Sequence, residues 1–92
     1  MSLKFGKILL TCNVNDKVEK DSNFAKEIVS AMRKYAQSDW GDLGQSDKKL
    51  NELAVKNGDE RVLASYKTSL GKVYIITEWD RSATTILFAN EY

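Results

Sequence analysis

The side chains most able to do chemistry lie together near the end of the chain, in Glu78, Trp79, Asp80 and Arg81. Apolar runs flank this group, so it is expected at a tight turn between two strands. Two interpretations compete. In the first, Arg81 pairs with a nearby acid, and Asp80 and Ser82 bond turn amides, which is the ordinary role of such residues in turns. In the second, the group forms a recognition epitope for another protein.

The composition leaves little equipment for catalysis. The chain has no histidine and one cysteine, Cys12, which lies in an apolar run and is expected to be a small buried residue. These counts remove Ser-His-Asp and Cys-His arrangements, Cys/His zinc sites and the usual general base at neutral pH. We do not expect Glu78 and Asp80 to act as a catalytic pair. The sequence therefore predicts a protein that is not an enzyme and that needs no cofactor or metal.

A second candidate region is the segment 38–45, SDWGDLGQ, whose glycines and aspartates predict a loop. A tryptophan in such a loop has two explanations. The ring of Trp40 either folds back as a lid over the core or stands exposed as an anchor for a partner, since tryptophan is enriched at binding hot spots. The candidate protein-binding residues are thus Trp40, Asp42, Glu78, Trp79, Asp80 and Arg81.

Hydrophobic patterning predicts the elements that position these residues. An apolar run at 7–14 is typical of a strand buried on both faces, followed by a charged connector. Apolar residues three and four apart predict a helix over 23–37 with a cap at Asp21-Ser22, and a narrower stripe predicts one over 47–56 with a cap at Ser46. Period-two runs between turn residues predict strands at 61–67, 72–79 and 83–89. The apolar face of the first helix comprises Phe24, Ile28, Ala31, Met32 and Tyr35.

The predicted fold is a single α+β domain over residues 1–92, with the order β-α-α-β-β-β. Short loops make the last three strands an antiparallel meander. The first strand is expected to join beside the last strand or between strands, giving a four-stranded, mostly antiparallel, mixed sheet with two helices packed on one face. Neither face of the last two strands is cleanly polar. The second face therefore needs cover from loops, lysine stems or termini, or else from a partner or a second copy in a homodimer.

Charge and hydropathy narrow the partners further. Fourteen basic and thirteen acidic residues give a net charge of +1, without the basic stripe of a nucleic-acid binder. The longest apolar run, residues 8–10, is far shorter than the roughly 20 residues that span a membrane. The first ten residues show no signal-peptide pattern. We expect a cytoplasmic protein that binds neither membrane nor nucleic acid.

Four segments also resemble a known family when taken together: FAKEI at 24–28, DWGDL at 39–43, NGDERVLASY at 57–66 and ITEWDRSATTILFANEY at 76–92. The chain resembles short proteins encoded on plasmids and conjugative elements of Gram-positive bacteria. These are commonly labelled plasmid-related proteins, and some are labelled type I restriction subunits, for which this chain is too short. The family brings no established activity and no catalytic residues. The resemblance implies an accessory gene of mobile DNA, a class that often encodes inhibitors of host restriction or CRISPR systems.

Three hypotheses of function follow. The first is a non-enzymatic accessory protein that binds a host protein, with a component of a defence system as the partner and an anti-CRISPR or anti-restriction inhibitor as the specific form. The second is a relative of RelE/ParE ribonuclease toxins, whose fold the predicted element order resembles. The near-neutral charge and the lack of histidine count against it. The third is a structural or regulatory homodimer.

Overall fold

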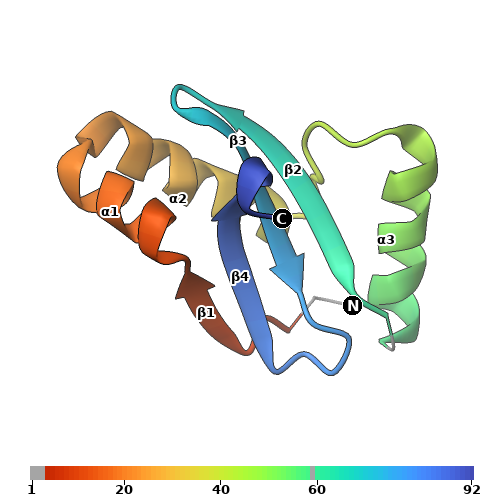
Figure 1. The fold of residues 1–92 in the computed structure, drawn as a ribbon. Coiled ribbons are helices and arrows are strands. Elements are labelled where there is room, and N and C mark those ends of the chain that lie inside the picture. Colours follow the sequence, from red (N-terminus) through yellow and green to blue (C-terminus); the bar gives the residue numbers. More distant parts are fainter. Residues whose placement is uncertain (1–3, 59) are drawn as a thin grey trace.

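A computed structural model describes residues 4–58 and 60–92 and shows an α+β architecture with a mixed four-stranded sheet (Figure 1). The fold class is confirmed, but the described chain has three α-helices where two were expected. The elements in chain order are β1 (Lys7–Leu10), α1 (Cys12–Lys20), α2 (Ser22–Ala36), α3 (Gln45–Asn57), β2 (Val62–Thr68), β3 (Gly71–Thr77), β4 (Ala83–Phe88) and the short 3-10 helix η1 (Ala89–Glu91).

The sheet has the strand order β1-β4-β3-β2. β2, β3 and β4 form the expected antiparallel meander, with Ile75 at its centre opposite Ala64 on β2 and Ile86 on β4. β1 pairs parallel with β4, so the expected mixed sheet is confirmed, and of the two expected places the first strand takes the one beside β4. A glycine begins this pairing: Gly6 has a φ of +63°, and a Cβ there would overlap the carbonyl oxygens of Arg81 and Ser82.

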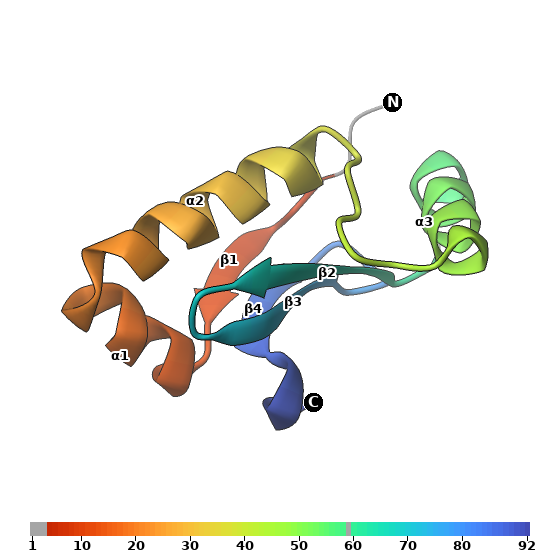
Figure 2. The same ribbon diagram turned by 90° about the horizontal axis from the view of Figure 1, so that it is seen from above.

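The core lies between α2 and one face of the sheet. The predicted apolar stripe of α2 is confirmed, because four of its five residues are buried and Met32 is partly buried. Figure 2 shows α2 above this face of the sheet and α3 beyond the β2 edge. The N-cap of α2 is Asp21, whose carboxylate accepts from the Phe24 N–H at 3.0 Å. The sheet side of this core is formed by Val62, Ala64, Val73, Ile75 and Ile86.

The prediction of one buried strand over 7–14 is wrong beyond Leu10. Thr11 has extended dihedral angles, and its hydroxyl accepts from the Val14 N–H at 3.3 Å, so it caps α1. The buried Val14 and the partly buried Val18 are four residues apart, so they lie on the same side of α1. This side faces the core. The expected charged connector is therefore the second half of a helix. Cys12, expected to be buried, lies in the first turn of α1 and is exposed.

β1 is also exposed rather than buried on both faces, because it is an edge strand that the helices cover only in part. Smaller corrections concern the ends of elements. α3 begins two residues earlier than predicted, with Gly44 rather than Ser46 at the N-cap. β3 ends at Thr77, which leaves Trp79 outside the strand, and the chain beyond Phe88 forms η1.

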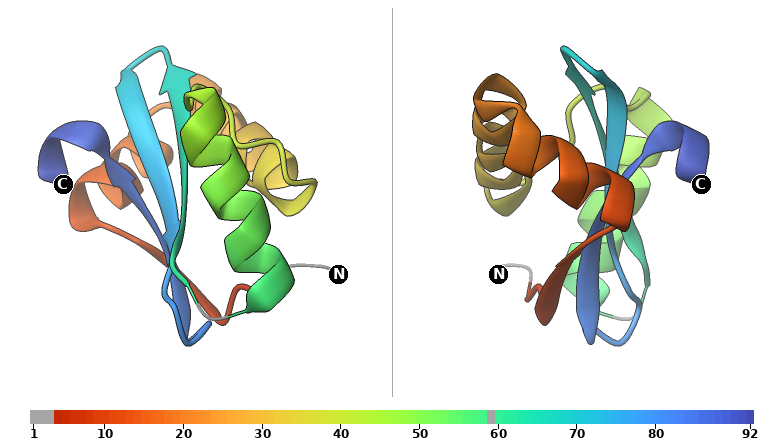
Figure 3. Two further views of the ribbon diagram at one scale, coloured as in Figure 1. Left: turned by 90° about the vertical axis from the view of Figure 1, so that its right-hand side faces the viewer. Right: turned by 60° about the vertical axis from the view of Figure 1, so that its left-hand side comes forward.

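The second face of the sheet is covered in part by the C-terminus. η1 lies on the side of the sheet opposite α1 and α2 (Figure 3). The ring of Tyr92 meets Tyr74 edge-on at 5.6 Å, and the Arg61 guanidinium lies 5.7 Å from the centre of the same ring. On this face Ile76 and Leu87 are only 6% and 9% exposed. The C-terminal residues thus provide part of the cover that was expected for the second face of the sheet. A homodimer through this face stays a prediction.

The outer edge of β2 is sealed by hydrogen bonds from the chain itself. The backbone of the 40–42 segment pairs with Ser65, whose N–H donates to the Trp40 carbonyl at 3.2 Å and whose carbonyl accepts from the Asp42 N–H at 2.6 Å. Asn51 on α3 does the same for Leu63, donating to its carbonyl at 2.6 Å and accepting from its N–H at 3.2 Å. Backbone groups of an edge strand that would otherwise be open for pairing are thereby satisfied.

Asn51→Ala is expected to lower the free energy of unfolding by about 1–3 kcal/mol, because Leu63 loses its partner while α3 still shields its N–H and carbonyl from water. Urea denaturation measures the change. Lys49→Ala, at an exposed site on the same helix, is the control and should stay within about 0.5 kcal/mol of the parent protein. Equal stability of the two variants would contradict this role of the amide.

Candidate functional site

Arg81, the most informative of the predicted site residues, binds backbone carbonyls rather than an acid. Its Nη1 donates to the carbonyls of Glu60 at 2.6 Å, Glu78 at 3.1 Å and Trp79 at 3.4 Å. Its Nη2 donates to the carbonyl of Ala54 at 2.9 Å, in the last turn of α3. The Ala54 carbonyl also accepts from the Gly58 N–H at 2.8 Å, so the guanidinium adds a charged second donor and ties the β3–β4 turn to the end of α3.

The rest of the turn group is largely occupied by local structure. The Asp80 carboxylate accepts from the Ser82 N–H at 3.0 Å, as the local interpretation expected. Hydrogen bonds from the Ser82 side chain and backbone lower the pKa of Asp80. The Glu78 backbone N–H donates to the carbonyl of Ala83 at 3.0 Å. Trp79 alone presents a large free surface, with 64% of the residue exposed.

Trp40 is a lid over the core. The residue is only 2% exposed, and its ring meets Tyr35 edge-on, with 5.5 Å between the ring centres. In this conformation it offers no exposed ring to a partner. Asp42 lies on the surface, with its carboxylate 3.4 Å from the Lys72 ammonium and 3.9 Å from that of Lys67.

The six predicted residues therefore occupy separate places and do not form one site. The turn at 78–81 holds four of them, the core holds Trp40, and the surface beside β2 and β3 holds Asp42. Of the turn residues, Arg81 and Asp80 are engaged in holding the chain. Their role in binding a protein stays a prediction, and Trp79 is the one best placed to carry it.

A chain of buried hydroxyls runs beneath the Trp40 lid. Tyr35 Oη lies 2.7 Å from Thr77 Oγ1, which lies 2.7 Å from Thr84 Oγ1. Thr84 donates to the carbonyl of Phe5 at 2.8 Å, so each hydroxyl before it is satisfied when it donates to the next. Burial raises the pKa of Tyr35 to about 12. This phenol is therefore protonated at neutral pH, as its place as the first donor of the chain requires.

A surface that the sequence did not predict lies at the β1 edge. Ile8 and Leu9 on β1 and Val29 on α2 are 54%, 46% and 50% exposed. A groove of about 480 Å³ opens between the two elements. The apolar run at 8–10 predicts a buried strand. An apolar residue outside the predicted core face of α2, Val29, was the one sequence signal for this surface. The groove is lined by Ile8, Leu10, Ile28, Val29, Met32, Arg33, Ala36 and Ile86.

The backbone of β1 is open on the same side. The Lys7 N–H donates to the Ser82 carbonyl and the Thr11 N–H to the Ile86 carbonyl, both at 3.1 Å and both toward β4. Backbone groups in a strand alternate in direction, so the N–H groups of Ile8 and Leu10 face away from the sheet. Within residues 4–58 and 60–92, β1 therefore presents both apolar side chains and unpaired backbone groups.

Comparison of the chain with protein-family models, curated proteins and solved structures finds no match. The resemblance to plasmid-related proteins therefore stays a prediction. In the part of the chain that the structure describes, no helix has the length and apolar character to cross a membrane.

Arg81→Ala is expected to lower the free energy of unfolding by about 2–3 kcal/mol, because the carbonyls at the end of α3 lose a charged donor. Arg81→Gly should lose about 1 kcal/mol less, since Arg81 has a φ of +62°, which costs glycine little. Urea denaturation ranks the variants, with the exposed Arg33→Ala as a control near the parent value. An alanine variant as stable as this control would contradict the role of the guanidinium.

The raised pKa of Tyr35 predicts a loss of stability at high pH. The unfolded phenol releases its proton near its ordinary pKa of 10.0 and the folded one near about 12. The stability from the protonated phenol is therefore complete below pH 10 and is lost between these two values, on the order of 2–3 kcal/mol. Unfolding free energies measured across this range should fall less steeply in Tyr35→Phe. If the unfolding free energy of Tyr35→Phe fell with pH as steeply as that of the parent protein, other groups would cause the loss of stability.

Proposed function

We propose that this chain is a non-enzymatic accessory protein that binds a host protein by accepting an extended segment of it on the free edge of β1. The observation that carries the proposal is the exposed apolar edge of β1 beside the groove under α2. Addition of a strand to an open sheet edge is an established mode of recognition: backbone hydrogen bonds supply affinity and side-chain pockets supply specificity.

The treatment of the two sheet edges supports this role. Proteins blunt open edges with charges, prolines, bulges or covering segments, because a bare edge pairs with other chains. Here the edge of β2 is sealed by Asn51 and the 40–42 segment. The edge of β1 has no such seal among the described residues, and it carries Ile8 and Leu9 in water.

The chemistry of the partner follows from the groove. Its lining is apolar apart from Arg33, and a neighbouring hollow on α2 adds Lys26. Of the described residues that line these two hollows, none is acidic. The partner segment should therefore be extended and apolar, with acidic residues at its flanks. A second copy of this chain would bring the same cations together, which disfavours the homodimer at this edge.

The kind of host protein that we propose as the partner rests on the resemblance to plasmid-related proteins. A gene of mobile DNA meets host defences, so a restriction or CRISPR component is the proposed partner. The ribonuclease-toxin alternative rests on the order β-α-α-β-β-β, whereas the described chain has one more helix, α1.

Ile8→Lys is expected to abolish partner binding, because a charge replaces the apolar contact in the groove while the residue stays half exposed in the free protein. Leu53→Lys on α3 is the matched control, since Leu53 is 53% exposed and Ile8 is 54% exposed. The measurement is the survival of a targeted plasmid in a host with an active restriction or CRISPR system. The parent protein and the control should raise survival at least tenfold over Ile8→Lys.

A photo-crosslinking residue placed at position 8 and, separately, at position 53 tests the contact itself. The host protein should be captured from position 8 alone. Capture of a species with twice the mass of this chain would instead indicate that the partner is a second copy of the chain. No protection in any defended host, together with no host protein captured at position 8, would overturn the proposal.

A further inference from the structure

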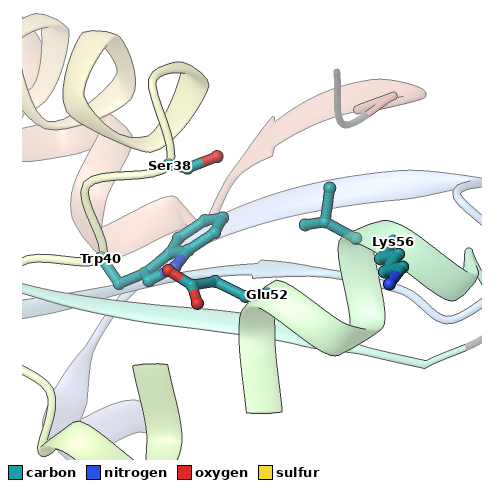
Figure 4. Close-up of a pocket in the computed structure, with 5 residues that line it drawn as sticks. Ser38, Trp40, Glu52 and Lys56 are labelled. Carbon is teal, nitrogen blue, oxygen red and sulfur yellow. The ribbon is translucent and has the colours of Figure 1, made fainter. Parts of the chain in front are cut away.

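A small hollow separates the segment around Trp40 from α3, on a different part of the surface from the β1 edge. It has a volume of about 230 Å³ and is lined by Ser38, Trp40, Glu52, Val55 and Lys56. Figure 4 shows the Trp40 indole beside Glu52, with Lys56 further along the same helix. The hollow thus has the nearly buried Trp40 at its base and one charge of each sign at its rim.

The indole of Trp40 has a donor with nothing to bind. Its Nε1 is buried and has no hydrogen-bond partner within residues 4–58 and 60–92. The ring cannot turn freely to find one, because Tyr35 packs against it and the Ser65 N–H holds the Trp40 carbonyl. Buried donors are nearly always satisfied, so an orphan on the wall of a hollow points to an acceptor that enters from outside.

The two charges at the hollow are arranged to receive a ligand with both signs. Glu52 and Lys56 are four residues apart on α3, a spacing at which Glu and Lys normally pair. No ion pair joins them in the described chain.

We infer that this hollow binds a small zwitterion of the free α-amino acid class. The ligand's ammonium group faces Glu52, its carboxylate faces Lys56, and a carboxylate oxygen accepts from the Trp40 indole N–H. The volume equals that of about eight water molecules at roughly 30 Å³ each, which is near the number of heavy atoms in a small amino acid. Because the indole nitrogen is buried, the exposed Glu52 side chain, which lies beside the indole (Figure 4), shifts aside to admit the ligand and then pairs with its ammonium group at the mouth of the hollow.

The two tryptophans make the test internally controlled. Each gives one indole N–H signal in an ¹H–¹⁵N spectrum, and Trp79, which is 64% exposed, lies outside the hollow. Titration with leucine should shift the Trp40 signal in a saturable way, with half-saturation near about 1 mM, and leave Trp79 in place. Acetate and ethylamine, which each carry one charge of the zwitterion, should bind at least tenfold more weakly.

Lys56→Gln should weaken leucine binding at least tenfold, while Lys49→Gln, an exposed lysine of α3 outside the hollow, should leave it unchanged. Three results would each overturn the inference: a Trp40 signal that no amino acid moves, one that acetate moves as well as leucine does, and binding that is the same in Lys56→Gln. Ile8→Lys should bind leucine normally, so this site and the proposed function can fail separately.

Discussion

The packing of Tyr35 is the interaction on which the other parts of this structure depend. Its ring is fully buried, 5.8 Å from Phe5 and 5.5 Å from Trp40, and its hydroxyl begins the hydrogen-bond chain that crosses β3 and β4. One side chain on α2 thus joins the segment before β1, the loop after α2 and the centre of the sheet. Phe5 fixes where β1 starts, and Trp40 forms a wall of the hollow at α3. Both proposed surfaces are therefore positioned by the same buried residue.

A second constraint is that each backbone group at a sheet edge needs a partner or water. At β2 the partners of the backbone groups are Asn51 and the 40–42 segment. Gly41 is required in this segment because a Cβ would overlap the Ser65 carbonyl. At β1 no partner for the outer N–H groups of Ile8 and Leu10 lies among the described residues, and Ile8 and Leu9 are also exposed. Exposed apolar side chains and exposed backbone groups are each common, but their coincidence on one short strand is the signature of a pairing surface.

The sequence predicted the elements whose patterns are local and periodic. The stripe of α2 and the alternation of β2, β3 and β4 each extend over several repeats, so the core face could be identified in advance. α1 was missed because Ile8 to Val14 reads as one apolar run, and the capping hydroxyl of Thr11 interrupts it without changing its hydropathy. The contacts of Asn51 with Leu63 and of Arg81 with Ala54 join residues that are close only after α3 has docked. No local pattern encodes such pairs.

The same distinction explains why the functional hypothesis moves away from the turn at 78–81. A conspicuous cluster of charges can serve a partner only with groups that the fold leaves free. The Arg81 guanidinium donates to four carbonyls, and the Asp80 carboxylate holds the Ser82 amide, so a partner that took either group would have to break the structure that presents it. Pairing at β1 carries no such cost, since its outer N–H groups and its apolar side chains already face water. The less conspicuous surface is therefore the one whose backbone and side-chain groups the fold leaves free together.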